Sequence, residues 1–331
     1  MAILAVVDEI ECFTNESSLT TVGQTTVKDS GQRGGFRTNS SNPLNIDLAS
    51  GVDEVWVRVL VGALSASSTS IPVISFVNSG TGKDNLQLFH IATTSHPNWR
   101  FRYNSTGTTY VTLAEMDLTE TESVTEFIIY WKRGASGVLK CWISGTLIVS
   151  VSGAYNTPDT TFDRIKFSGT SASTSTSVMF IAGSVIVADE PIFDCFVDHI
   201  SPDGSGTYSE WTGAYTDVDD SAEAPFWNTS TDINVNATGQ RFLATYASMD
   251  ALDASREVAA VQLAARGILE SGSTPTDVLF KSRLSSTDYL LNSLNLSTTA
   301  SNARQTMNAD PATNAWTESN VNAIEFGVET A

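Results

Sequence analysis

Short stretches in which apolar and polar residues alternate recur about every ten residues through roughly the first two hundred positions. The clearest is Glu54–Gly62 (EVWVRVLVG), where four valines share one side and Trp56, Arg58 and Leu60 share the other. Side chains alternate across a β-strand, so this period of two predicts a strand with one buried face. Gly, Ser, Asn or Pro bounds each stretch, which predicts turns between the strands.

The other stretches share this pattern and bring the set to about ten predicted strands. They are Ala2–Val7, Ile71–Val77, Leu86–Ala92, Trp99–Tyr103, Thr109–Leu113, Glu126–Lys132, Leu139–Ile143, Leu147–Val151, Phe162–Phe167 and Val178–Val187. Gly134–Gly137 lies between two of them and predicts a hairpin turn. Many short strands without a convincing helix predict an all-β fold of the sandwich or jelly-roll type.

The stretch Ile200–Gly213 (ISPDGSGTYSEWTG) separates this pattern from a second one. Pro202–Gly206 has turn chemistry, so we predict a break outside any regular strand or helix. Tyr208 and Trp211 follow at once and are expected to pack the joint. A length of 331 residues favours about two domains. We therefore predict two β-sandwich domains in tandem, residues 1–200 and residues 201–331.

The formal net charge is −19, from 37 acidic and 18 basic residues. Binding to nucleic-acid phosphates takes clustered lysine and arginine, so we expect no nucleic-acid partner. The same charge argues against adhesion to an anionic membrane, and no apolar run reaches the ~20 residues of a membrane span. The simplest use of this charge is solubility at high local concentration.

The three cysteines, Cys12, Cys141 and Cys195, are an odd and widely spaced set without a zinc-binding pattern. We therefore expect free thiols, folding in a reducing cytosol, and neither a metal nor a cofactor. The first residues, MAILAVVDEI, lack a basic start and turn acidic at Asp8, so no signal peptide is predicted.

Four segments of the first half follow one another as strand, glycine turn and strand: Tyr130–Lys132, Lys140–Ser150, Phe162–Gly169 and Phe180–Asp189. In this order they resemble the core of concanavalin-A-like and laminin-G-like jelly rolls, over roughly residues 35–190. The resemblance implies a jelly-roll sandwich for the first domain. That fold carries lectins, hydrolases and structural modules alike.

Five motifs of the second half form an ordered series: Ser209–Trp211, Val218–Asp220, Val258–Arg266, Asp310–Thr317 and Asn322–Glu329. In that order they resemble the C-terminal half of a group of tailed-bacteriophage virion proteins, which often have a laminin-G-like N-terminal half. Ser285–Asn308 departs from the group's pattern. The resemblance implies a structural protein of the virion, assembled in the host cytoplasm, in the tail, collar or fibre or as a capsid decoration.

Two segments of the second half bear on helix content. Periodicity leaves Val258–Arg266 open between helix and strand, and the resemblance to the phage proteins favours a strand. Thr317–Ile324 predicts a helix, with Thr317 as its N-cap, Glu318 in the first turn and Gly327 ending it.

Glu115, Asp117 and Glu120 have an E-x-D-x-x-E spacing that resembles the catalytic stretch of laminarinase-type glycosidases on the same fold. The resemblance implies a strand that brings three carboxylates to one face, where retaining hydrolysis needs two of them about 5 Å apart. The alternative is an acidic loop between the strands Thr109–Leu113 and Glu126–Lys132. The acidic run that continues after Glu120, and the absence of adjoining aromatic residues, favour the loop.

The histidines, His90, His96 and His199, form no HExxH motif, nucleophile elbow or metal spacing. His90 is predicted in a strand and His96 in a loop. We therefore predict no role for them in catalysis or metal binding.

A glycan site has four candidate residues. Trp99, Tyr103 and Tyr110 could form a platform on which a sugar stacks, and Asp84 could bind calcium. The alternative is that these aromatic side chains fill the core of the sandwich, because about half of the positions in alternating strands point inward.

A structural virion protein must present a surface that is buried only in the particle, and such surfaces are rich in aromatic residues and poor in charge. Pro225–Trp227 and Trp316–Phe326 are the candidate segments, although Trp316 can instead pack beneath the predicted helix. We expect a non-enzymatic protein with other virion proteins as partners, and self-association as a trimer or ring. Two alternatives remain: a receptor module that binds host surface glycans, and a glycan hydrolase that uses Glu115, Asp117 and Glu120.

Overall fold

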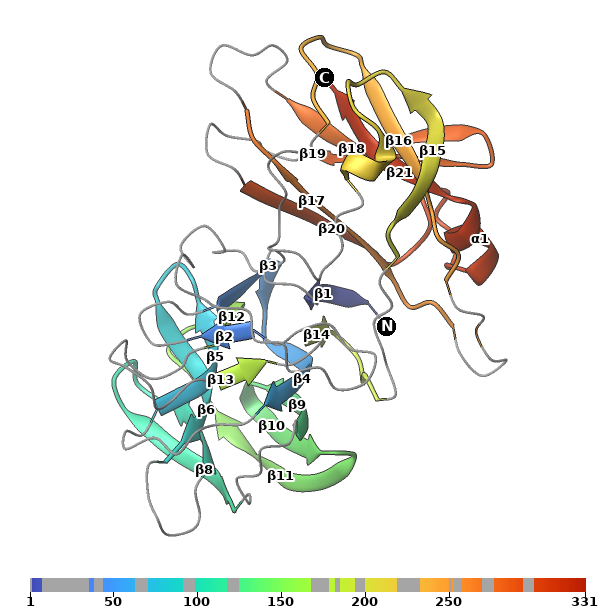
Figure 1. Cartoon of the computed structure of the whole chain (residues 1–331). Helices are drawn as coiled ribbons and strands as arrows, with labels where there is room; N and C mark the ends of the chain where they lie inside the picture. The colour runs from blue at the N-terminus through green and yellow to red at the C-terminus, as the bar shows by residue number, and fades with distance from the viewer. Residues whose placement is uncertain are drawn as a thin grey trace. The chain divides into compact units, whose positions relative to one another are not determined.

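The computed structural model describes residues 2–7, 36–38, 44–62, 71–91, 99–117, 125–167, 179–181, 185–193, 200–218, 233–249, 252, 257–269, 277–293 and 301–331. The chain divides into two compact units, Ile3–Phe196 and Val197–Ala331. Strands make up most of the secondary structure of each unit (Figure 1), which confirms the predicted all-β fold.

The first unit contains two antiparallel sheets. Sheet A has the strand order β1-β14-β4-β9-β10-β11, with β13 pairing both β4 and β2. Its strands are β1 (Ile3–Val7), β2 (Phe36–Thr38), β4 (Glu54–Gly62), β9 (Thr125–Lys132), β10 (Gly134–Ile143), β11 (Thr146–Tyr155), β13 (Met179–Ile181) and β14 (Val185–Ala188). Sheet B has the order β3-β12-β5-β6-β7-β8. Its strands are β3 (Leu44–Val52), β5 (Ile71–Asn78), β6 (Lys83–His90), β7 (Trp99–Asn104), β8 (Tyr110–Met116) and β12 (Phe162–Phe167).

The core of the first unit lies between these sheets. Val55, Val57 and Val59 are fully buried on one side of β4, as the alternation in Glu54–Gly62 predicts. Across the core, the rings of Trp99 in β7 and Phe127 in β9 approach to 5.8 Å between centroids. Each fully buried aliphatic or aromatic side chain contributes about 1.5–3 kcal/mol of hydrophobic stabilisation.

The predicted hairpin and one predicted strand end can be compared with the structure. Pairing of β9 with β10 begins at Lys132 opposite Val138, so Gly134–Gly137 lies in the reversal between these strands, as predicted. The same residues also belong to β10, because Gly134 and Gly137 pair with β11. Gly134 has a φ of 102°, the left-handed region that glycine adopts without steric cost. The strand predicted at Thr109–Leu113 continues to Met116 in β8.

The second unit packs a five-stranded sheet against a two-stranded ribbon. Sheet C has the order β15-β16-β21-β18-β19, and the ribbon pairs β17 with β20. The elements are β15 (Pro202–Ser209), the 3-10 helix η3 (Tyr215–Asp217), β16 (Arg241–Tyr246), β17 (Val261–Gly267), β18 (Val278–Leu284), β19 (Thr287–Ser293), β20 (Ser301–Met307), helix α1 (Glu318–Ala323) and β21 (Glu325–Thr330).

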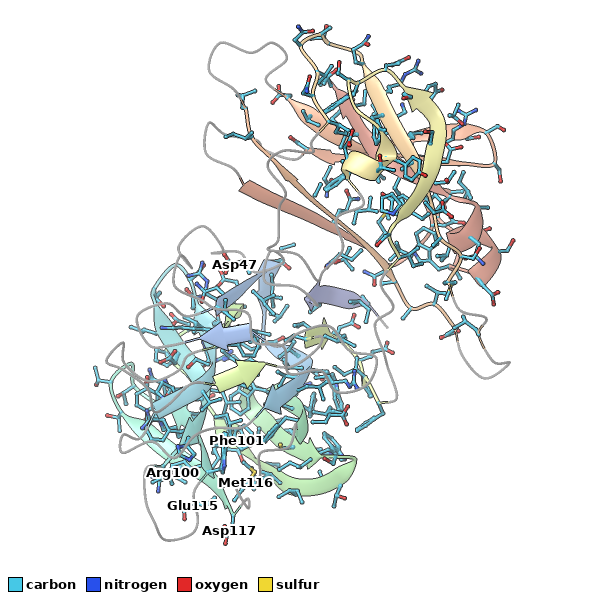
Figure 2. The ribbon with its side chains drawn as sticks, in the orientation of Figure 1. Asp47, Arg100, Phe101, Glu115, Met116 and Asp117 are labelled. Carbon is cyan, nitrogen blue, oxygen red and sulfur yellow. The ribbon has the colours of Figure 1, made fainter. Side chains whose placement is uncertain are left out.

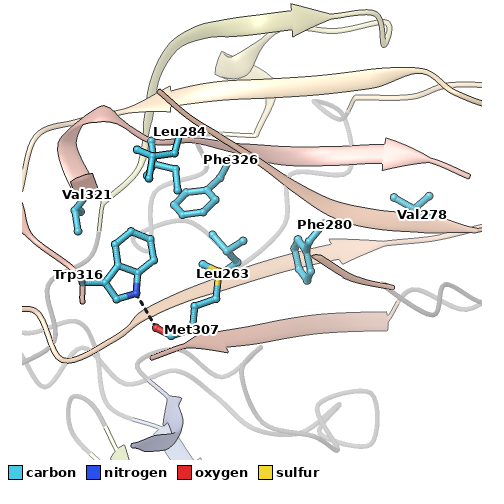
Figure 3. Close-up of a cluster of buried hydrophobic side chains, with 9 residues drawn as sticks. Leu263, Val278, Phe280, Leu284, Met307, Trp316, Val321 and Phe326 are labelled. Carbon is cyan, nitrogen blue, oxygen red and sulfur yellow. Dashed lines mark hydrogen bonds between the residues drawn. The ribbon is translucent and has the colours of Figure 1, made fainter. Parts of the chain in front are cut away.

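A compact apolar cluster joins these layers (Figure 3). Phe280 and Phe326 of sheet C meet Leu263 and Met307 of the ribbon, and Trp316 lies among them with 4% of its surface exposed. The Trp316 indole Nε1–H donates to the Met307 carbonyl at 2.9 Å. The alternative that Trp316 packs beneath its helix therefore holds, and the prediction that Trp316–Phe326 exposes aromatic side chains is wrong. Pro225–Trp227 lies outside the described residues.

The prediction that Pro202–Gly206 forms a turn between domains is also wrong, because these residues belong to β15. This strand lies at the edge of sheet C, pairs with β16 alone, and shifts register twice. An edge strand tolerates proline, and bulges accommodate glycine. A Cβ on Gly206 would lie 2.8 Å from the Leu243 carbonyl carbon, so the close approach of β15 requires glycine there.

Helix α1 and strand β17 agree with the sequence predictions. The Thr317 hydroxyl accepts a hydrogen bond from the Asn320 N–H at 3.1 Å, which is the expected N-cap. Val261–Gly267 is a strand, as the resemblance favoured. Gly327 does not end the helix, since the chain becomes extended at Ile324 and Gly327 lies within β21.

Candidate functional site

The first residue of the predicted acidic stretch, Glu115, lies near the end of β8 on the outer face of sheet B. Figure 2 shows Glu115 and Asp117 near Arg100, with Met116 between them in sequence and Asp47 well apart from this group. Glu115 accepts a hydrogen bond from Arg100 at 2.7 Å, and Met116 is buried. The loop interpretation is therefore wrong for Glu115, which lies in a strand. Glu120 lies outside the described residues.

A polar and aromatic network covers the same outer face. The Tyr110 hydroxyl donates to Asp84 at 2.8 Å, and the Gln87 amide donates to the same carboxylate oxygen at 2.6 Å. The Arg102 guanidinium lies 3.7 Å from the centre of the Phe89 ring and 4.4 Å from that of Tyr110. Burial, together with the negative charge of Asp84, raises the pKa of Tyr110 to about 12. Tyr110 therefore stays a neutral hydrogen-bond donor at physiological pH.

The four residues predicted for a glycan site do not form one platform. Trp99 is 4% exposed and packs against the core residue Phe127, so it lies on the opposite side of sheet B from Tyr110. Tyr103 contacts Tyr155 of sheet A, 5.5 Å between ring centroids. Of the predicted residues, the fold brings together Tyr110 and Asp84 alone.

Sheet A carries a second cluster on its outer face, which the sequence analysis did not identify. Trp56 of β4 stacks on Tyr130 of β9 at 4.6 Å and on Trp142 of β10 at 5.4 Å. Phe193 packs edge-on against both tryptophans, at 5.8 Å from Trp56 and 4.9 Å from Trp142. Trp56, Tyr130 and Trp142 become neighbours only through the pairing of β4, β9 and β10, which the sequence does not show.

This cluster continues into exposed apolar side chains, and we call the combined surface the apolar patch: Trp142, Leu147, Ile148 and Phe193. Leu147 is the cross-strand neighbour of Trp142, and Ile148 is the extra residue where the register of β11 shifts. Leu147 and Ile148 are each 47% exposed and Phe193 is 40% exposed. Contiguous exposed apolar groups of this kind mark contact surfaces more often than isolated ones do.

Charged side chains border the cluster. Glu54 accepts hydrogen bonds from the Tyr130 hydroxyl and from the Lys132 ammonium, both at 2.7 Å. Partial burial opposes ionisation of Glu54, but the hydrogen bonds from Lys132 and Tyr130 outweigh it and hold its pKa below the usual value. Arg58 pairs with Glu126 at 2.5 Å along the same face. An apolar centre with a paired polar rim is typical of protein contact surfaces.

The second unit has its densest charge network on the face of sheet C that turns away from the ribbon. Lys281, 5% exposed, lies 2.5 Å from Glu329 and 3.3 Å from Asp288. Tyr208 covers it, donating to Asp288 at 2.9 Å and stacking under the Arg241 guanidinium at 3.6 Å. Each member has a partner within the second unit. The network therefore attaches β15 to its sheet.

No group of three or more metal-ligating side chains occurs in the part of the chain that the structure describes. Within the same residues, His90 is buried against the Trp99 ring and Cys141 is a buried free thiol whose pKa burial raises. His96, His199, Cys12 and Cys195 lie outside the described residues. The described helices are all too short or too polar to cross a bilayer.

No family model matches the chain, and no curated protein matches it. Among solved structures, the receptor-binding domain of botulinum neurotoxin D is similar at 12% identity and a TM-score of 0.42, over 57% of this chain and 50% of that one. The chain thus spans about half of that domain. The serotype D ligand-binding domain in complex with N-acetylneuraminic acid matches at 13% identity and a TM-score of 0.42, over 57% and 48% of the two chains. The endo-β-1,4-glucuronan lyase of the fungus Trichoderma reesei matches at 12% and 0.39, over 51% and 87%.

Proposed function

We propose that this chain is a non-catalytic structural component of a tailed-phage virion that meets other virion proteins through the apolar patch. The observation that carries the proposal is the patch itself, in which Leu147, Ile148 and Phe193 are 40–47% exposed next to a stacked tryptophan pair. A solvent-exposed surface of this kind is favourable only where a partner removes it from water. The virion assignment is supported by the resemblance of the ordered motifs of residues 200–331 to tailed-bacteriophage virion proteins.

The arrangement around Glu115 supports a role without catalysis. Retaining hydrolysis needs a carboxylic acid and a carboxylate facing one bond, whereas Glu115 is bound to the Arg100 guanidinium at 2.7 Å. We expect Glu115→Gln to leave the thermal stability within about 0.5 kcal/mol, because an exposed ion pair contributes little. Release of reducing ends from a polysaccharide by the wild type, and its loss in the variant, would establish the hydrolase instead.

The proposal is tested with virions that lack the chain. Purified wild-type protein should bind such particles and co-sediment with them. Leu147→Ser combined with Phe193→Ser should lower the bound fraction at least about tenfold, since each buried side chain of this size is worth about 1.5–3 kcal/mol. The matched control places two serines at Ile268 and Leu290, which are 54% and 56% exposed in the second unit. Equal binding by all three proteins would contradict the assignment of the patch, and failure of the wild type to bind would contradict the virion role.

A second candidate, glycan binding, has one observation in its favour. Tyr110, Asp84, Gln87 and Arg102 gather hydroxyl, carboxylate, amide and guanidinium groups on the outer face of sheet B. These groups already bond to one another, and Arg102 covers one face of Tyr110. A glycan array distinguishes the candidates: retention of a sugar by the wild type, and its loss in Tyr110→Ala, would favour the receptor module.

A further inference from the structure

Strand β11 is an unusual sheet edge. It spans ten residues, Thr146–Tyr155, and among the strands that the structure describes it pairs with β10 alone. Natural edge strands are protected by charged residues, by proline or by shortness, because open backbone N–H and C=O groups invite pairing. The other described edges of the three sheets follow this rule: β3 has Asp47, β8 has Glu115, β15 has Pro202 and Asp203, β19 has Asp288, β1 spans five residues and β2 spans three. Strand β11 is long and has neither a charged residue nor a proline, and its register shifts are confined to its two ends.

The middle of β11 is also suited to pairing. Between the register shifts near its two ends, Val149–Gly153 pairs regularly with Gly137–Cys141. Ser150, Ser152 and Ala154 are exposed along the strand. Within the part of the chain that the structure describes, the hydrogen bonds outside regular strand pairing include none from the β11 backbone. Small uncharged side chains on a regular edge leave room for another strand.

Charge identifies the partner. The chain has a net charge of −19, so two copies repel wherever their acidic surfaces meet. Residues 141–158 contain no charged residue, and β11 lies within them. The adjacent edge strand β8 adds Val111, 41% exposed, on the same side of the sandwich. Along β11 and beside Val111, this side therefore offers one copy an uncharged approach to another.

We propose that two copies of the chain pair through β11, antiparallel about a two-fold axis, so that sheet A continues from one copy into the other. The pairing is self-complementary, because a two-fold axis makes each residue of one strand meet the reciprocal residue of its partner. It also brings Leu147 and Ile148 of each copy toward the far end of the partner's β11. The inference rests on the proposed structural role, and it names a second copy of the chain as the partner of the β11 edge.

The test uses the full chain and measures its mass by analytical ultracentrifugation across a concentration series. The wild type should form a dimer whose association strengthens as salt screens the net charge. Ser150→Glu combined with Ser152→Glu should weaken it about two- to thirtyfold, since like charges on paired strands each cost about 0.2–1 kcal/mol and occur twice in the dimer. The control, Ala49→Glu combined with Ser50→Glu, adds the same charge at exposed positions of β3 and should not weaken it.

Hydrogen exchange gives an independent measurement that needs no variant. Backbone amides within Thr146–Tyr155 should lose protection when the wild type is diluted below its dissociation constant, while β4 keeps its protection. A wild-type monomer at all concentrations, or a dimer with unchanged exchange in β11, would overturn the inference. A monomer that still binds particles would leave the structural role intact. A β11 dimer that binds no particles would leave the inference intact and remove the role.

Discussion

Lys281→Met tests whether the charge network holds β15 on sheet C. The lysine side chain is 6% exposed, whereas the Glu329 and Asp288 side chains that it bridges are 22% and 26% exposed. Methionine keeps most of the volume and removes the charge, so the change in stability reports the electrostatic contacts.

The magnitude follows from what each carboxylate keeps. Removing one partner of a fully buried ion pair costs about 3–5 kcal/mol. Asp288 retains Arg283 and the Tyr208 hydroxyl, so Glu329 bears most of the loss. Because the carboxylates are also partly hydrated, we expect a loss of about 2–3 kcal/mol in the free energy of unfolding.

Urea unfolding at pH 7, followed by circular dichroism, measures this loss. With a slope of about 2 kcal/mol per molar, the midpoint of the second unit should fall by about 1–1.5 M. Adding Glu329→Gln to Lys281→Met removes the stranded carboxylate and should recover about 1 kcal/mol. A single variant within about 0.5 kcal/mol of the wild type, or a double variant no better than the single, would refute the reasoning.

Three further outcomes concern the second unit. Gly327→Ala should prevent stable folding, because a Cβ there would lie 1.9 Å from the Phe242 carbonyl oxygen; a cooperative melt near the wild-type temperature would contradict this. Trp316→Phe should cost about 2–3 kcal/mol by leaving a cavity and an unpaired Met307 carbonyl, measured by thermal denaturation against Val218→Ala as an exposed control. Burial opposes ionisation of Asp288, but hydrogen bonds from Arg283, Tyr208 and Lys281 outweigh it and lower the pKa of Asp288. The stabilisation that Asp288 provides is therefore present above the unfolded pKa of about 3.9 and is lost as the pH falls through the folded pKa. Thermal melts at pH 2–7 that show no loss of stability below pH 4 would argue against the network.

The fold class was readable from the sequence because strand periodicity is a local property. Alternation in Glu54–Gly62 fixed which valines face the core, and the Thr317 cap located the helix. The turn predicted at Pro202–Gly206 was wrong because proline and glycine occur in irregular edge strands as well as in turns. That distinction depends on β16, some forty residues later.

The candidate surfaces were less readable, since they depend on pairing between distant strands. Trp56, Tyr130 and Trp142 become neighbours through the registers of β4, β9 and β10. Trp99 and Tyr110 both looked like sugar platforms, yet they lie on opposite sides of sheet B. One register step decides which side of a sheet a ring occupies, and no local pattern reports it.

The place of β21 in sheet C has a consequence for synthesis. This strand, Glu325–Thr330, lies between β16 and β18, so each of these neighbours has one unpaired edge until β21 has been made. While the ribosome is still adding residues, the nascent second unit exposes two unpaired strand edges. In the first unit it is the first strand that waits. β1 is made early, and its partner β14 follows about 180 residues later. Chains in synthesis therefore expose unpaired strand edges of both kinds until the completing strand has been made.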